Sequence, residues 1–149
     1  IYFAHEDQHF DLRTIQRHAA PKAHSDTLYK GAVIGESHTV FQGLIRVEHD
    51  AVGTDAYLTN NNLVLSEEAR SDSIPSLQIN TDDVRCSHGS TTGKLDEKQL
   101  FYLHSRGYPQ DEARRMLVEG YFEAVLSLYP ESSQERIREI IAGRIAEGD

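Results

Sequence analysis

The sequence predicts a mainly β protein with a helical C-terminal part. From Phe10 to about Val84, short runs rich in Thr, Val, Ile, Tyr and Phe alternate apolar with polar residues and are broken by Gly, Asp and Asn. This pattern is typical of many short strands. After Gly93 the apolar residues recur at the spacing of helices. We therefore expect strands over residues 1–93 and a helical domain over residues 94–149.

A weak internal repeat indicates how the strands are arranged. Residues 25–33 align with residues 37–45 at an offset of twelve, with Ser, Thr and Gly identical and aromatic matching aromatic. A fixed offset with turn residues between strands predicts stacked coils, as in a parallel β-helix. A β-sandwich produces similar sequence patterns, so both arrangements stay open at this point. Asn60-Asn61-Asn62 is expected to form a turn between two strands, because Asn tolerates left-handed backbone conformations.

The only cysteine of the chain, Cys86, lies where the strand pattern is about to end, with His88 two residues later. Residues two apart in an extended strand point to the same face, so the thiol and the imidazole are predicted to lie side by side. A thiolate beside an imidazole suits zinc, iron or a nascent iron–sulfur unit. The structural alternative is a small buried thiol next to a hydrogen-bonded histidine. If His88 is protonated, it is expected to lower the pKa of the Cys86 thiol.

Three helices are predicted after Gly93. Asp96 is expected to cap the first helix, with Gln99 completing a capping box, and Gly107 to end it in a left-handed conformation. Ser132 with Glu135 forms a second capping box for the last helix. The apolar stripes expected to be buried comprise Ala113, Met116, Leu117, Gly120, Tyr121, Ala124 and Leu128 in the second helix and Ile137, Ile140, Ile141 and Ile145 in the third.

Charge and composition argue against two classes of partner. Asp and Glu total 24 against 15 Lys and Arg, for a net charge of −9 over 149 residues, and no basic face for nucleic acid is apparent. No apolar run approaches the roughly 18 residues that cross a bilayer. One cysteine forms no internal disulfide, which fits a reducing compartment. No secretory leader is visible, and a solenoid that began at Ile1 would expose unpaired backbone, so we expect a piece of a longer protein.

Two enzymatic alternatives remain open. The stretch from His5 to His9 reads H-E-x-x-H, which binds zinc in hydrolases when a helix places both imidazoles on one face. The residues that follow alternate like a strand, so this context is not the required one. A carbohydrate-active β-helix enzyme would need paired carboxylates. The adjacent pairs Glu67-Glu68 and Asp82-Asp83 would point to opposite faces of a strand and form no ready acid/base couple.

A long run of residues carries a family resemblance. The segment from Cys86 to Gly107, C-S-H-G-S-T-T-G-K-L-D-E-K-Q-L-F-Y-L-H-S-R-G, closely resembles the one that ends the β-helix core and opens the helical domain in the SufB/SufD family of iron–sulfur cluster assembly proteins. Further pieces resembling family signatures are residues 25–31, 40–47, 54–66 and 73–79. The H-G-S-T-T form after residue 87, and Ala69 where SufB-type chains carry a functional cysteine, match the SufD type.

The resemblance implies a fold and a function. Residues 1–93 would be the C-terminal coils of a right-handed parallel β-helix, followed by a small three-helix domain over residues 94–149. The protein would be a non-enzymatic scaffold subunit of a SufB–SufC–SufD complex. His88 would serve first, as a transient ligand of iron or an iron–sulfur cluster or as a group that moves protons near it. Cys86 would serve second, and no tightly bound cofactor is expected.

The resemblance also implies partners and a compartment. A SufC-like ABC ATPase would dock on helices within residues 96–128, and a SufB-like paralogue or a second copy of the chain would pair with the β-helix. No G-x-x-x-x-G-K-S/T phosphate loop is present, so ATP hydrolysis would belong to the partner. The compartment would be the bacterial cytoplasm, or the plastid stroma in a eukaryote.

Overall fold

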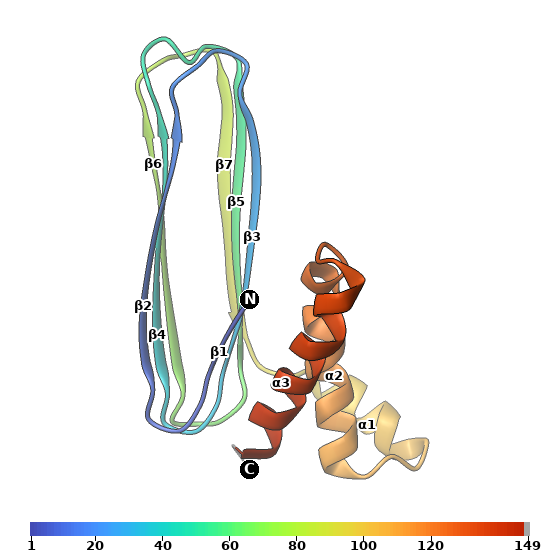
Figure 1. The fold of residues 1–149 in the computed structure, drawn as a ribbon. Coiled ribbons are helices and arrows are strands. Elements are labelled where there is room, and N and C mark those ends of the chain that lie inside the picture. Colours follow the sequence, from blue (N-terminus) through green and yellow to red (C-terminus); the bar gives the residue numbers. More distant parts are fainter. Residues whose placement is uncertain (148–149) are drawn as a thin grey trace.

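A computed structural model describes residues 1–147, in which seven strands wind into a parallel β-solenoid and three helices follow (Figure 1). The strands form two sheets, with the orders β1-β3-β5-β7 and β2-β4-β6, and every pairing is parallel. This arrangement confirms the stacked coils and excludes the sandwich, whose sheets are antiparallel. The strands are β1 Tyr2–Ala4, β2 His9–His18, β3 His24–Val33, β4 His38–Val47, β5 Thr54–Val64, β6 Arg70–Ile79 and β7 Val84–Gly93.

The coil repeat is longer than the offset of twelve that we expected. His9 of β2 pairs with His38 of β4, and His38 pairs with Arg70 of β6, so one coil takes about 30 residues. The two aligned segments lie in β3 and at β4, which are consecutive strands in opposite sheets. The sequence offset therefore related the two sides of one coil rather than two stacked coils.

The interior of the solenoid is filled from alternate positions of each strand. In β4 every second residue is buried, including Phe41 and Ile45, and these pack against Ala56 and Leu58 of β5. This is the period of two that a strand imposes on its side chains. Gly43 lies where a Cβ would meet the side chains of Leu58 and Phe41, so any larger residue there would require these buried side chains to shift.

The three asparagines do not form the predicted turn. β5 continues through them, and Asn60 and Asn62 are buried inside the solenoid. The Asn62 side chain donates to Asn60 Oδ1 at 2.8 Å, Asn60 donates to the Tyr2 hydroxyl at 3.0 Å, and that hydroxyl donates to Asn62. Because these amides are satisfied by one another and by Tyr2, the strand can bury them, and this overrides the preference of Asn for turns.

Helix α1 (Glu97–Ser105) follows the predicted boundaries. The Asp96 carboxylate accepts a hydrogen bond from the Lys98 amide at 2.8 Å, so the cap forms at Lys98 rather than at Gln99. At the other end Gly107 has φ +93°, as predicted, and its amide donates to His104 at 2.9 Å. The Tyr108 amide donates to Leu103 O at 3.2 Å, which completes the hydrogen-bond pair of a Schellman motif.

Helices α2 (Gln110–Leu126) and α3 (Glu131–Glu147) exist where expected, but the buried faces differ from the prediction. Met116 and Leu128 are exposed, as is Ile140 in α3. Helix α3 begins at Glu131, directly after Pro130, so Ser132 lies inside the helix and is not its cap. The residues that α2 and α3 bury are Ala113, Val118, Phe122, Val125, Leu126, Ile141 and Ile145.

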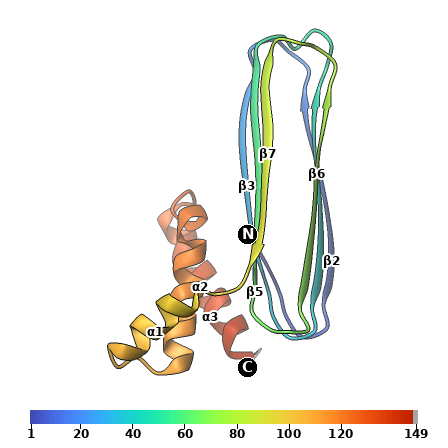
Figure 2. The same cartoon turned by 180° about the vertical axis from the view of Figure 1, so that it is seen from behind.

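The buried helix faces pack on the solenoid, which explains the difference. Phe122 and Leu126 share one core cluster with Ala32 of β3 and Leu63 of β5. Figures 1 and 2 show the helices beside the outer face of the β3-β5-β7 sheet, on the side of the molecule away from the β2-β4-β6 sheet. Polar contacts add to this packing: the Tyr121 hydroxyl donates to Asn61 O at 2.6 Å, and Lys30 donates to Tyr121 O. Within residues 1–147, no helix is long and apolar enough to span a membrane.

Candidate functional site

Strand β7 carries both predicted site residues at the last coil of the solenoid. In register, Cys86 pairs with Ala56 and His88 pairs with Leu58, and both partners point into the solenoid interior. Cys86 and His88 therefore share the inward face of β7, about one two-residue step of 6.6–7 Å apart along the strand. The thiol is partly buried against the core that contains Ala56, whereas the imidazole is exposed.

The inward face of the last coil is open among the described residues. β7 and β6 end their respective sheets, so neither has a further strand stacked on it. Leu77 and Ile79 of β6 align with the fully buried Ile45 and Val47 of β4, yet each is 38% exposed. These inward apolar side chains are exposed at the open end of the solenoid because no further coil of the described chain covers them. Such an exposed apolar surface is suited to a protein partner.

Burial, not His88, dominates the ionisation of the thiol. Burial raises the pKa of Cys86, and the nearby Asp55 carboxylate raises it further, while a hydrogen bond with the Ala56 backbone opposes the shift. The expectation of a lowered pKa is therefore wrong. A thiol of this kind holds its proton at neutral pH and releases it when a metal binds, because metal binding needs the thiolate.

Helix α1 presents two strongly exposed aromatic side chains within the predicted partner region. It buries none of its residues, and Phe101 and Tyr102 are 74% and 56% exposed. A pocket of about 290 Å³ separates α1 from the start of α2 and includes Leu100, His104 and Arg114 in its lining. A short helix with no fully buried residue, and with two aromatic side chains exposed, is a surface available to a partner.

The H-E-x-x-H stretch lies in a turn and not in a helix. Glu6 has φ +54° in the turn that joins β1 to β2, so His5 and His9 do not share a helix face. His5 is buried and contacts Arg144 of α3, while the His9 and His38 rings meet edge to face with their centroids 5.0 Å apart. No group of three or more His, Cys, Asp or Glu within the described part of the chain could hold a metal ion.

The acidic pairs offer no glycosidase geometry. Glu67-Glu68 lies in the bend between β5 and β6, and Asp82-Asp83 in the bend before β7, so neither pair belongs to a strand as we had supposed. All four side chains are exposed. A carbohydrate cleft between facing carboxylates does not arise from these positions.

One contact near the site was not anticipated. Tyr57 of β5 lies over β7, and a Cβ at Gly89 would come within 2.9 Å of its hydroxyl oxygen. Gly89 directly follows His88, so the tyrosine covers the outer side of the strand whose inner side carries the imidazole. A glycine inside a strand often marks such a close approach, but only the sheet register identifies Tyr57 as the neighbour.

The chain is similar in sequence to proteins of iron–sulfur cluster assembly. Residues 1–121 match the family model described as SUF system FeS cluster assembly, SufBD core domain. An iron–sulfur cluster assembly SufBD family protein of Mycobacterium leprae is 44% identical over 135 residues, covering 85% of this chain and 34% of the relative. The iron–sulfur cluster assembly protein SufD of Escherichia coli is 38% identical over 139 residues, covering 93% of this chain and 33% of the relative. The chain thus spans about a third of the length of these relatives.

Proposed function

The chain belongs to the SufBD family of the SUF system for iron–sulfur cluster assembly, and we propose that it acts there as a SufD-like scaffold rather than as an enzyme. The observation that carries this proposal is the position of Cys86 and His88. Both face inward on the last, uncovered coil of the solenoid, where a partner subunit can meet them.

The cluster is cargo in this proposal, and the chain supplies only part of its ligands. A thiolate and an imidazole are suitable donors for iron, but two donors do not complete a four-coordinate site. The remaining ligands would come from the partner that covers the coil or from the sulfide of the cluster. Because one subunit supplies only some of the ligands, the cluster would be held transiently and not bound tightly. A scaffold that passes on its cargo requires such transient binding.

His88 takes the leading role in the proposal because it is the more accessible donor. Its side chain is exposed, whereas Cys86 is partly buried and its thiol pKa is raised. An imidazole can bind iron as the neutral base without a change in the buried part of the site. Cys86 would bind second, after losing its proton.

The partners follow from the two exposed apolar surfaces. A SufB-like paralogue, or a second copy, would cover the inner face of β6 and β7, where Leu77 and Ile79 are exposed. A SufC-like ATPase would dock on α1 and the first part of α2, within residues 96–128, where Phe101 and Tyr102 are available. Both relatives compared above are bacterial, which favours the bacterial cytoplasm over the plastid stroma as the compartment.

The test replaces each donor in the full-length protein assembled with its partners. We expect His88→Ala to lower the cluster yield, followed by visible absorbance during reconstitution, by roughly tenfold or more, the scale of losses at metal sites. Cys86→Ser should have the smaller effect. His49→Ala is the matched control, because His49 is exposed in the turn after β4.

Co-elution of the subunits shows whether a variant fails to assemble the protein complex or fails to form the cluster. If the His88→Ala complex assembles normally and forms clusters at the rate of the His49→Ala complex, the proposed role of His88 is refuted. If assembly itself fails, zinc or iron titration of the isolated variants, compared with the unsubstituted protein, decides whether the imidazole is a donor.

A further inference from the structure

A groove lies between the outer face of the β1-β3-β5-β7 sheet and the turn that joins α2 to α3. Its volume is about 600 Å³, within the range of ligand-binding clefts. The sheet contributes strands β3 and β5, and the helical part contributes the last turn of α2 and the connection after it. The lining residues are Asp26, Thr27, Leu28, Tyr57, Thr59, Val125, Leu128 and Tyr129.

Three large side chains in this groove remain exposed. Leu128 is 76% exposed, Tyr57 43% and Tyr129 40%, although Val125 beside them is buried. Aromatic residues at the centre of a surface patch are typical of protein contact sites. With this much of its lining open to water, the groove is suited to a segment of a protein rather than to an enclosed small molecule.

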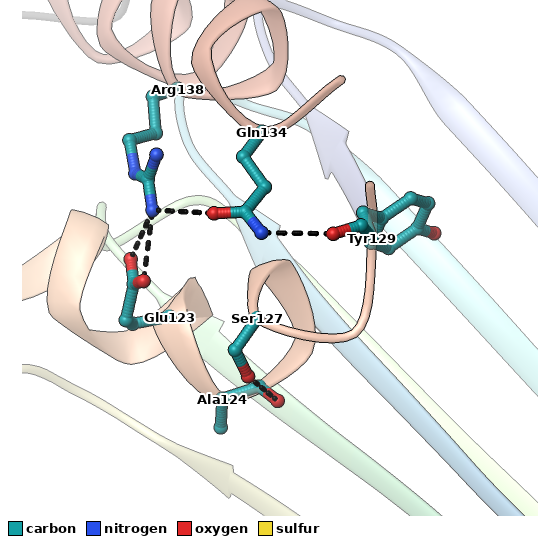
Figure 3. Close-up of polar contacts among 6 residues, drawn as sticks. All are labelled: Glu123, Ala124, Ser127, Tyr129, Gln134 and Arg138. Carbon is teal, nitrogen blue, oxygen red and sulfur yellow. Dashed lines mark hydrogen bonds and ion pairs between the residues drawn. The ribbon is translucent and has the colours of Figure 1, made fainter. Parts of the chain in front are cut away.

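A polar network fixes the turn that bears Leu128 and Tyr129, as Figure 3 shows. Arg138 of α3 donates to Glu123 of α2 at 2.9 Å and to Gln134 Oε1 at 3.2 Å. Gln134 in turn donates to the backbone oxygen of Tyr129 at 2.8 Å. The backbone that carries the exposed side chains is therefore held in place before any partner binds, which reduces the entropy that binding would cost.

Charge identifies the kind of partner. Asp26 is the only charged residue that lines the groove, and it forms no hydrogen bond or ion pair with any residue of the described chain. In register it lies opposite Tyr57 on the outer face of the sheet. A carboxylate beside two tyrosines suits an Arg or Lys side chain, whose charged end pairs with the carboxylate while its stem and cation contact the rings.

The groove also adjoins the strand of the candidate site. Tyr57 pairs with Ser87 in register, and its hydroxyl lies over Gly89. These two residues flank His88 in β7. A partner seated on Tyr57 would therefore contact the outer side of the strand whose inner side carries the imidazole.

We propose that this groove binds an extended segment of a partner protein that carries an Arg or Lys between apolar residues. The tyrosine rings and Leu128 take the apolar residues and the stem of the basic side chain, and Asp26 pairs with its cation. The proposal concerns a surface separate from α1 and from the open coil end, so it stands whether or not the proposed cluster chemistry is correct.

Two synthetic peptides test the proposal on the full-length protein. Both are fluorescein-labelled and have the same alternating leucines, with arginines between them in one and glutamates in the other. Fluorescence anisotropy at low salt is expected to show binding of the arginine peptide at least tenfold tighter than that of the glutamate peptide. Asp26→Lys should reverse this preference, and Tyr129→Ala should weaken the arginine peptide about fivefold or more.

The control is Ile15→Ala, which removes an exposed apolar side chain from the outer face of the other sheet, 70% exposed in β2. It should leave both affinities unchanged. Circular dichroism confirms that each variant is folded, which is expected because all three positions are at least partly exposed. Equal affinity of the arginine peptide for the Asp26→Lys variant and the unsubstituted protein overturns the proposal. So does complete displacement of the peptide by equimolar free arginine, which would make the occupant a small cation.

Discussion

At the scale of single residues, Cys86 shows how the ionisation of a side chain depends on residues far from it in the sequence. Alternation in residues 84–88 was enough to predict that its thiol and the His88 imidazole share a face. The environment of the thiol comes instead from Ala56 and Asp55, one coil earlier. Its chemistry is therefore that of a desolvated thiol beside a carboxylate.

This environment predicts the pH dependence of thiol alkylation. Burial and Asp55 both disfavour the thiolate, so the pKa lies above the 9.0 of an unperturbed thiol. Because iodoacetamide reacts with the thiolate, the midpoint of the rate profile should fall above pH 9.0. Mass spectrometry of intact residues 1–149 can follow the reaction, since Cys86 is the only cysteine among them.

A second variant separates the two causes. Asp55→Asn removes the like charge and should move the midpoint toward 9.0 without reaching it, because burial is the larger cause. A midpoint at or below 9.0 in the unsubstituted protein would contradict this account and restore His88 as the dominant neighbour.

The asparagines of β5 illustrate what residue preferences omit. Asn60 and Asn62 have the preferences of turn residues, and local reasoning placed them in a turn. In the solenoid their amides bond to each other and to Tyr2, about 60 residues away in sequence. A local sequence pattern does not reveal a hydrogen-bond partner so far away in the sequence, so this part of the core could not be predicted.

At the scale of elements, caps were easier to predict than buried faces. Asp96 and Gly107 act through neighbouring backbone groups, and both ends of α1 agree with the sequence. The face that α2 buries depends on Ala32 and Leu63 of the solenoid. Since α2 has apolar residues on more than one side, its spacing predicted a helix but not which side would meet the sheet.

Removal of the α1 cap tests the element-scale argument. Asp96→Ala deletes the acceptor of the Lys98 amide and should cost about 1 kcal/mol of local helix stability. Because α1 buries none of its residues, we expect faster hydrogen exchange of the amides of residues 97–100 and little change in the global melting temperature.

Asp111→Ala is the matched control for this prediction. Asp111 is also an acidic residue in a first helical turn, but α2 has no side-chain cap. Its loss should change exchange in α2 by only the few tenths of a kcal/mol of a helix-dipole contact. Unchanged exchange of the Lys98 amide in Asp96→Ala would show that the cap does not hold α1.

At the scale of the whole molecule, the strand pattern predicted many short strands but left a solenoid and a sandwich open, and it was the family resemblance that favoured the solenoid. Each coil has two strands in opposite sheets, and similar turn residues recur on both sides, which explains the offset of twelve. The true coil length of about 30 residues appears only in the pairing of β2 with β4 and β3 with β5. The position of the helices on the sheet likewise depends on contacts between distant segments.

Those contacts imply that solenoid and helices unfold as one unit. Phe122 is fully buried, and its ring lies 6.3 Å from that of Phe3 in β1, within the cluster that joins the two parts. Phe122→Ala should cost about 3–5 kcal/mol, a large fraction of the stability of an ordinary domain. The loss falls on the contact between the parts, so the helices should lose their structure before the strands do.

Two probes of urea unfolding can separate the two parts, since circular dichroism at 222 nm is dominated by the helices and hydrogen exchange of the amides of β4 and β5 reports the solenoid. The unsubstituted protein should give coincident transitions, and Phe122→Ala an earlier helical one. Leu128→Ala, on the same part of the chain but 76% exposed, should stay within about 0.5 kcal/mol of the unsubstituted protein. Coincident transitions in Phe122→Ala would mean that the helices are stabilised by packing on one another and not by packing on the sheet.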